Sequence, residues 1–158
     1  MKRMAILFTT LLIVGCGDDD GTTASSPATT GTITGALTLT GDGCPTENIT
    51  IALFSGGMDG PPAFYTSNFT IENNSYSYTI SEIAFGTYEN LGVAWDDPNG
   101  TDPVSNQIGF AIYGQTFNTT TYQMEGTPTP VTLSADSPTL ENADITGDCM
   151  LIEYMQGQ

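Results

Sequence analysis

The chain has 158 residues, of which 18 are Asp or Glu, two are Lys or Arg and none is His, so its formal net charge is −16. The two basic residues are Lys2 and Arg3, and no cationic or imidazole side chain follows them. This composition excludes histidine-dependent nucleophilic triads, Schiff-base lysines and arginine phosphate clamps. It also excludes nucleic acid as a partner, because affinity for a phosphate backbone depends on Lys and Arg.

The N-terminus has the pattern of an export signal. Lys2 and Arg3 precede an apolar run over residues 4–14. The run is too short to cross a bilayer, which needs about 20 helical residues. We therefore predict that residues 1–15 are a signal peptide and that the mature protein begins at Cys16.

The residues around the expected cleavage point, Ile13-Val14-Gly15-Cys16, resemble the bacterial lipobox. In such lipoproteins the cysteine carries a diacylglycerol thioether and acyl chains such as palmitate. The resemblance implies a lipid anchor at Cys16, with the membrane as the protein's first partner and the cell envelope as its location. Gly17 directly after the cysteine resembles the sorting signal for the outer membrane and leaves the face of that membrane open. The alternative is a plain secretory signal with a chance cysteine.

Residues 16–31 contain no aliphatic side chain larger than alanine. Such a segment cannot bury enough apolar surface to offset the entropy lost on ordering. We predict a flexible acidic tether, which could extend to about 50 Å. Its acidic triplet either repels anionic lipid head groups or serves only solubility.

From residue 32 onward apolar and polar residues alternate with period two, as around Ile33 and Ile51. This periodicity is typical of half-buried strands, and no window shows a sustained helical stripe. We predict an all-β fold, a single antiparallel β-sandwich of seven to nine strands over residues 32–149, with a last strand or tail over 150–158. Beyond these first two strands the predicted ranges are 64–71, 75–80, 87–95, 107–113, 119–124, 131–135 and 143–146.

Cys44 and Cys149 are the thiols that remain once Cys16 carries a lipid. An even pair in an exported protein predicts a disulfide. The chain-entropy model gives such a long loop about 4 kcal/mol of stabilisation. We expect the bond to join the last strand to the tethered end of the domain; two free thiols or a metal pair are the alternatives.

The segment 76–88 (YSYTISEIAFGTY) resembles the strand-turn-strand signature of transthyretin-like sandwiches, which include carboxypeptidase regulatory-like domains and collagen-adhesin repeats. The resemblance implies that Ile83 and Phe85 close one end of the sandwich, that Gly86 permits a tight turn and that Tyr88 faces inward. It also implies a non-catalytic module. The internal Lys-Asn isopeptide bond of many adhesin repeats is excluded here, because the mature chain has no lysine.

An acidic loop follows the strand that is predicted to end at Trp95. Asp96, Asp97, Asn99 and Asp102 supply oxygen ligands of the kind that Ca²⁺ prefers. The spacing is not that of an EF-hand, because the glycine falls two positions early. The alternative is a solvated surface turn bent by the Pro-Asn-Gly sequence.

Trp95 is the candidate for ligand binding, because an exposed ring beside polar groups can stack on a sugar. Alternating aromatic residues on strands are more often core packing. Catalysis by carboxylates alone is not expected: neither Asp-Thr-Gly nor Asp-Ser-Gly occurs in the sequence.

The sequence therefore predicts a non-catalytic, lipid-anchored β-sandwich module of the envelope with a structural or binding role and no cofactor. Its partner would be another envelope protein or a polysaccharide. The alternative is a calcium-assisted carbohydrate-binding or adhesion module that uses Trp95 and the loop over residues 96–102.

Overall fold

The computed structural model describes residues 28–72, 75–100 and 106–157. The expected signal peptide, Cys16 and most of the expected tether therefore lie outside the described residues. The described residues form thirteen strands and one short helix, and the fold is an all-β sandwich as predicted.

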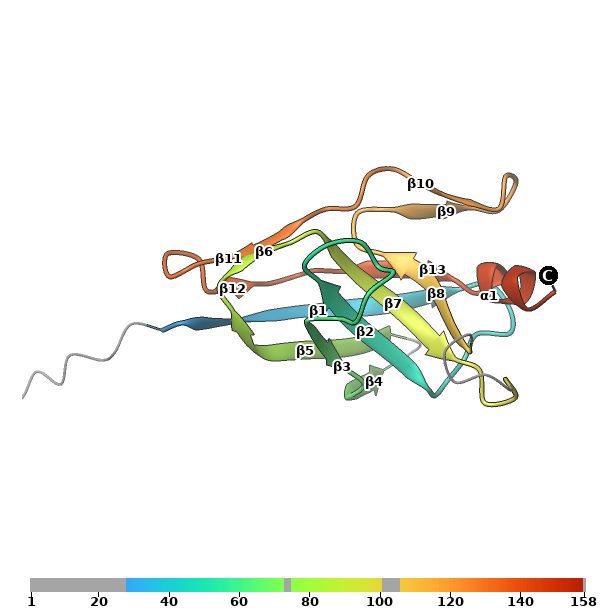
Figure 1. Cartoon of the computed structure of the whole chain (residues 1–158). Helices are drawn as coiled ribbons and strands as arrows, with labels where there is room; N and C mark the ends of the chain where they lie inside the picture. The colour runs from blue at the N-terminus through green and yellow to red at the C-terminus, as the bar shows by residue number, and fades with distance from the viewer. Residues whose placement is uncertain (1–27, 73–74, 101–105, 158) are drawn as a thin grey trace, which may run out of the picture.

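Two sheets make up the body of the molecule (Figure 1). The first sheet is built around β1 (Thr30–Thr40), which pairs with β5 (Ser75–Ala84), and β5 pairs with β4 (Phe69–Glu72). The second sheet has the order β3-β2-β7-β8, with bounds Phe64–Thr66, Ile49–Phe54, Asn90–Asp96 and Gln107–Ile112. Two small ribbons accompany them, β6 (Gly86–Tyr88) with β11 (Val131–Leu133) and β9 (Thr116–Asn118) with β10 (Gln123–Glu125).

The core lies between the two sheets and follows the period-two pattern. Ile33 and Leu37 of β1 are fully buried, and so are Ile51 and Leu53 of β2. Successive side chains of a strand point to opposite faces, so these alternating residues share the inner face. Phe110 of β8 is the largest of the fully buried side chains.

Three of the predicted strand ranges were wrong in detail, and the strand β12 was not predicted, which together explain why the described strands exceed seven to nine. The range 64–71 is two strands, because the chain leaves the second sheet after β3 and enters the first sheet as β4. The range 87–95 is likewise split between β6 and β7. The range 119–124 is mostly the turn between β9 and β10, where Asn118 accepts hydrogen bonds from the backbone amides of Thr120 and Thr121 at 2.8 and 3.1 Å.

The first sheet is not wholly antiparallel, and this corrects the prediction of a purely antiparallel sandwich. The strands β12 (Thr139–Leu140) and β13 (Ile145–Asp148) both run parallel to β1 along the same edge. The register pairs Thr32 with Thr139 and Leu37 with Ile145. The two-residue strand β12 is too short to produce a recognisable alternation.

The segment predicted as a last strand or tail contains the helix α1 (Met150–Gln156), which is a correction. Leu151 and Ile152 are buried on the core side of this helix, and its other residues are exposed. Seven residues are fewer than a periodic helical pattern needs to be recognised in a sequence. No helix among the described residues is both long and apolar enough to cross a membrane.

The segment 83–88, whose roles were expected from the resemblance to transthyretin-like sandwiches, has some of these roles and not others. Ile83 is fully buried, Phe85 is half-buried against the core, and Tyr88 is buried with its hydroxyl donating to the Ala84 carbonyl at 2.7 Å. Gly86 does not have the expected role, because its φ is not positive and an added Cβ would meet no atom within 4 Å.

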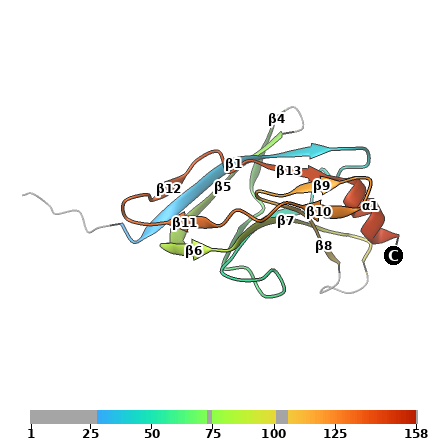
Figure 2. The same ribbon diagram turned by 90° about the horizontal axis from the view of Figure 1, so that it is seen from above.

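The elements run between two opposite ends of the sandwich. The chain enters at the start of β1, whereas the β1–β2 loop (residues 41–48), residues 97–100 and α1 lie at the other end, as two perpendicular views agree (Figures 1 and 2). We call this second end the distal end. Its position corrects one expectation: Cys44 and Cys149 lie at the distal end and not at the end where the tether is expected to attach. Cys44 is in the first inter-strand loop, as expected, but the whole length of the 11-residue strand β1 separates this loop from the start of the sandwich.

Candidate functional site

The predicted disulfide between Cys44 and Cys149 is present. The two Cα atoms lie 5.1 Å apart and the sulfur atoms 2.04 Å apart. Cys149 is fully buried directly before α1, and Cys44 lies in the β1–β2 loop. The bond therefore fixes the start of the helix and the β1–β2 loop to each other at the distal end.

The described part of the acidic loop is held by hydrogen bonds at both of its first two residues. The Asp96 amide donates to the Asn48 carbonyl at 2.9 Å, and the Asp96 carboxylate accepts from Gln107 Nε2 at 3.2 Å. Asp97 Oδ1 accepts from the Asn99 amide at 2.8 Å. Asp97 Oδ2 accepts from Gln156 Nε2 at 3.0 Å, so the loop is also attached to α1.

These hydrogen bonds explain the protonation behaviour of Asp97. The backbone amide of Asn99, followed by the side chain of Gln156, lowers the pKa of Asp97 because both donors favour its charged form. The Asn99 contact is an Asx turn of the type that bends a Pro-Asn-Gly segment. Asp97 thus shapes the turn with one oxygen and holds the helix with the other.

The predicted calcium ligands are only partly placed by the structure. Asp96, Asp97 and Asn99 are described, whereas Asp102 lies outside the described residues. Across residues 28–72, 75–100 and 106–157, no three side chains of the His, Cys, Asp or Glu type come together as a metal site would require. Calcium binding by the complete loop stays a prediction.

Trp95 is not the exposed ring that a sugar-stacking platform needs. It is half-buried and packs against the core, and its neighbours across the sheet are Ile49 and Ile108. Leu91, Val93 and Trp95 alternate along β7, so the ring continues the inward row of side chains. This arrangement favours core packing over ligand binding for Trp95.

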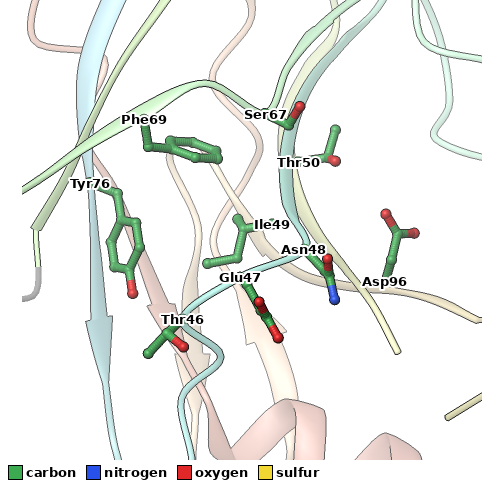
Figure 3. Close-up of a pocket in the computed structure, with 9 residues that line it drawn as sticks. All are labelled: Thr46, Glu47, Asn48, Ile49, Thr50, Ser67, Phe69, Tyr76 and Asp96. Atoms are coloured by element: carbon green, nitrogen blue, oxygen red, sulfur yellow. The ribbon is translucent and has the colours of Figure 1, made fainter. Parts of the chain in front are cut away.

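A concave site that the sequence did not predict lies beside Asp96 (Figure 3). It is a hollow of about 480 Å³. Strands of both sheets and the β1–β2 loop contribute to it, so it opens between the sheets at the distal end. Its lining, which defines what we call the hollow, consists of Thr46, Glu47, Asn48, Ile49, Thr50, Ser67, Phe69, Tyr76 and Asp96.

One side of the hollow is aromatic. The rings of Phe69 and Tyr76 meet edge to face with centroids 6.1 Å apart, and the Tyr76 hydroxyl donates to the Pro45 carbonyl at 3.3 Å. Phe69 is half-buried and Tyr76 is buried. The sequence shows these residues only as members of alternating strands, and nothing in that pattern indicates that two separate strands place them at the mouth of the sandwich.

The other side of the hollow is polar and acidic. Glu47 and Asp96 are exposed at its rim, and Asn48 lies between them (Figure 3). Asn48 has φ +59°, a left-handed conformation that Asn tolerates better than most residues. The carboxylates, the amide and the aromatic wall together can hold a ligand, but they include no nucleophile with an adjacent base.

A second group of aromatic side chains lies where α1 meets the β9–β10 ribbon. Tyr122 and Tyr154 stack with centroids 4.8 Å apart, and Phe117 meets Tyr122 edge to face at 6.3 Å. Both stacked tyrosines are partly exposed. The stack attaches the C-terminal helix to the ribbon.

Comparisons with protein-family models, with curated proteins and with solved structures found no significant match to this chain.

Proposed function

We propose that this protein is a non-catalytic binding module of the bacterial cell envelope, anchored by a lipid on Cys16 and folded as a transthyretin-like sandwich. The sequence around Cys16 supports the anchor, since Ile13-Val14-Gly15-Cys16 has the order of a lipobox. Several acyl chains together hold a protein on a membrane without a spanning helix.

One observation carries the binding role: the chain enters the sandwich at one end, and the hollow lies at the other. β1 has 11 residues, which corresponds to about 35 Å of extended strand between these ends. A tether attached at the start of β1 would therefore present the hollow and the adjoining loops away from the membrane. Loops positioned by a rigid scaffold are where binding residues concentrate.

The absence of catalysis is supported by the side chains available. No Lys, Arg or His follows position 3, so a general acid and base would have to come from carboxyl or phenol groups. A carboxyl that acts as a general acid needs a raised pKa, whereas hydrogen bonds lower the pKa of Asp97.

The anchor is tested by expressing the full chain in a Gram-negative bacterium with an alkyne analogue of palmitate and analysing the product by mass spectrometry. We expect a diacylglyceryl cysteine as the N-terminal residue and recovery in the membrane fraction. The Cys16→Ser variant should lack the label and stay unprocessed. An unmodified Cys16 thiol in the mature native product would refute the anchor.

The display of the distal end is tested on whole and osmotically opened cells of the same strain. A protease that reaches the β1–β2 loop only after the outer membrane is opened would place the domain in the periplasm, and cleavage on intact cells would place it on the surface. A product found only in the cytosol would contradict the proposed location.

A further inference from the structure

The rim of the hollow is negatively charged, and no described side chain carries a positive charge that could neutralise it. Glu47 and Asp96 lie at its rim, and no cationic side chain follows Arg3 anywhere in the sequence. None of the described residues is Lys, Arg or His, so within the described part of the chain no positive side chain is available to these carboxylates, and a positive partner would come from another molecule. A concave surface lined by charges of one sign concentrates ligands of the opposite sign.

The aromatic side of the hollow selects the shape of such a ligand. Tyr76 and Ile49 are 6% and 3% exposed, so neither side chain offers a broad open surface to a ligand. A pyranose stacks on an open face, whereas a slender alkyl stem needs only a narrow apolar wall. The remaining wall residue, Phe69, is half-buried and lies on the same side as Tyr76 (Figure 3).

The walls are held in place before any ligand arrives. The Tyr76 hydroxyl is bound to the Pro45 carbonyl, the Asp96 amide to the Asn48 carbonyl, and the Asp96 carboxylate to Gln107. Each of these bonds joins two different segments of the chain. A site with fixed walls loses less conformational entropy on binding than a mobile one.

We infer that the hollow binds a primary ammonium or guanidinium group carried on an aliphatic stem. The positive group pairs with Glu47 and Asp96 at the rim, and the stem lies along Phe69 and Tyr76. A free diamine and a lysine or arginine side chain of a partner chain both have this chemistry. The inference deepens the proposed binding role and rests on it, but it does not depend on the anchor at Cys16.

The test is a calorimetric titration of the full chain in non-ionic detergent at constant ionic strength, with four probes. Cadaverine represents the free amine, and 1,5-pentanediol is its uncharged analogue. An acetylated and amidated Gly-Lys-Gly peptide represents the side chain of a partner, and the same peptide with norleucine is its control. We expect cadaverine, the lysine peptide or both to bind, and the diol and the norleucine peptide not to bind. The stronger of the two charged probes identifies the source.

The variants separate binding in the hollow from general attraction to an acidic protein. Glu47→Gln with Asp96→Asn should weaken binding about tenfold, as expected for the loss of two partly exposed ion pairs. Glu141→Gln with Asp136→Asn removes the same charge at exposed sites outside the hollow and should change affinity less than twofold. Cooperative melting transitions at or above the temperature of the native protein would show that both double variants are folded.

Three results would overturn the inference: no binding of either charged probe, equal binding of charged and uncharged probes, or an equal loss in the two double variants. None of them bears on lipid attachment or membrane recovery, so a failure here is distinguishable from a failure of the proposed anchor. Conversely, a cytosolic, unmodified protein could still bind cadaverine.

Discussion

Gln156, the last residue of α1, donates a hydrogen bond of 3.0 Å to the Asp97 carboxylate across 59 positions of sequence. The C-terminal helix is thereby fastened to the loop after β7, while the disulfide from Cys149 fastens its beginning to the β1–β2 loop. Three described segments of the distal end are thus joined by the disulfide and this side-chain hydrogen bond, together with the backbone hydrogen bond from Asp96 to Asn48.

The first prediction concerns the titration of Asp97. Its pKa is lowered from 3.8 by the Asn99 amide and the Gln156 side chain, so the charged form is favoured in the folded state. A lowered pKa contributes stability above the unfolded value, and this contribution is lost as the pH falls below 3.8 toward the folded value. NMR titration of the side-chain carboxyl should give a midpoint below 3.8.

Gln156→Ala should raise that midpoint toward 3.8 without removing the Asn99 contribution. Gln123→Ala, at an exposed position of β10, is the matched control and should leave it unchanged. An Asp97 midpoint that does not respond to Gln156→Ala would show that the contact is not kept in solution.

The second prediction concerns the disulfide. Cys44 and Cys149 are 105 positions apart, so their bond restricts most of the unfolded chain. Replacing both with alanine should lower the free energy of unfolding by up to about 4–5 kcal/mol. Chemical denaturation with and without reductant measures this. Reductant should destabilise the native protein and have no effect on the double variant. Equal stability of the native protein and the double variant without reductant would contradict the entropic account.

The sequence allowed the fold class and the central strands to be predicted, because alternation around Ile33 and Ile51 requires only local information. It did not allow the ends of strands to be predicted where the chain passes from one sheet to the other. Nothing local distinguishes Phe64 from Phe69, yet they lie in different sheets. The helix α1 was missed because two buried residues, Leu151 and Ile152, are too few to establish a helical period.

The candidate site could be predicted only in part. The disulfide between Cys44 and Cys149 could be predicted because these are the two thiols that remain once Cys16 is expected to carry a lipid. The hollow was not, because Glu47, Phe69 and Asp96 come from three segments that only the topology brings together. Trp95 was selected for its ring and its acidic neighbours, but the inward face of β7 places it against the core.

The third prediction concerns a buried tyrosine in the core. Tyr78 is 3% exposed, and its hydroxyl donates to the Ala143 carbonyl beside β13. Tyr78→Phe leaves that buried carbonyl without this donor and should cost about 1–3 kcal/mol in free energy of unfolding. Tyr65→Phe is the control, because Tyr65 is 68% exposed and should change stability little. Denaturation curves compare the two; equal effects would contradict the buried hydrogen bond.

Tyr78 also predicts behaviour at high pH. Burial, then the nearby charge of Asp144, raises the pKa of Tyr78 above its usual value of 10.0. The folded state therefore holds its proton where the unfolded state releases it, so stability is complete below pH 10 and falls as the pH rises above that value. The Tyr78→Phe variant should show a smaller fall over the same range.

The strand β1 and the segment before β13 approach each other closely at a glycine. A Cβ on Gly35 would lie 2.3 Å from the Ala143 carbonyl oxygen, which is backbone and cannot swing aside. Gly35→Ala should therefore separate β1 from the segment before β13 and lower the melting temperature, by at least as much as Tyr78→Phe. Gly86→Ala is the control, because a Cβ there meets nothing within 4 Å. A destabilised Gly86→Ala variant with an unaffected Gly35→Ala variant would contradict the predicted close contact at Gly35.

The last prediction concerns the net charge. With 18 acidic residues and basic residues only at positions 2 and 3, the folded chain repels itself at low ionic strength. The Debye length falls from about 30 Å at 0.01 M salt to about 8 Å at 0.15 M, so added NaCl should raise the melting temperature by several degrees. Millimolar CaCl₂ at matched ionic strength should act like NaCl if the 96–102 loop is only a solvated turn. A larger rise with Ca²⁺ that is lost in Asp97→Asn would establish a metal site there, because a ligand that binds only the folded state stabilises it by mass action.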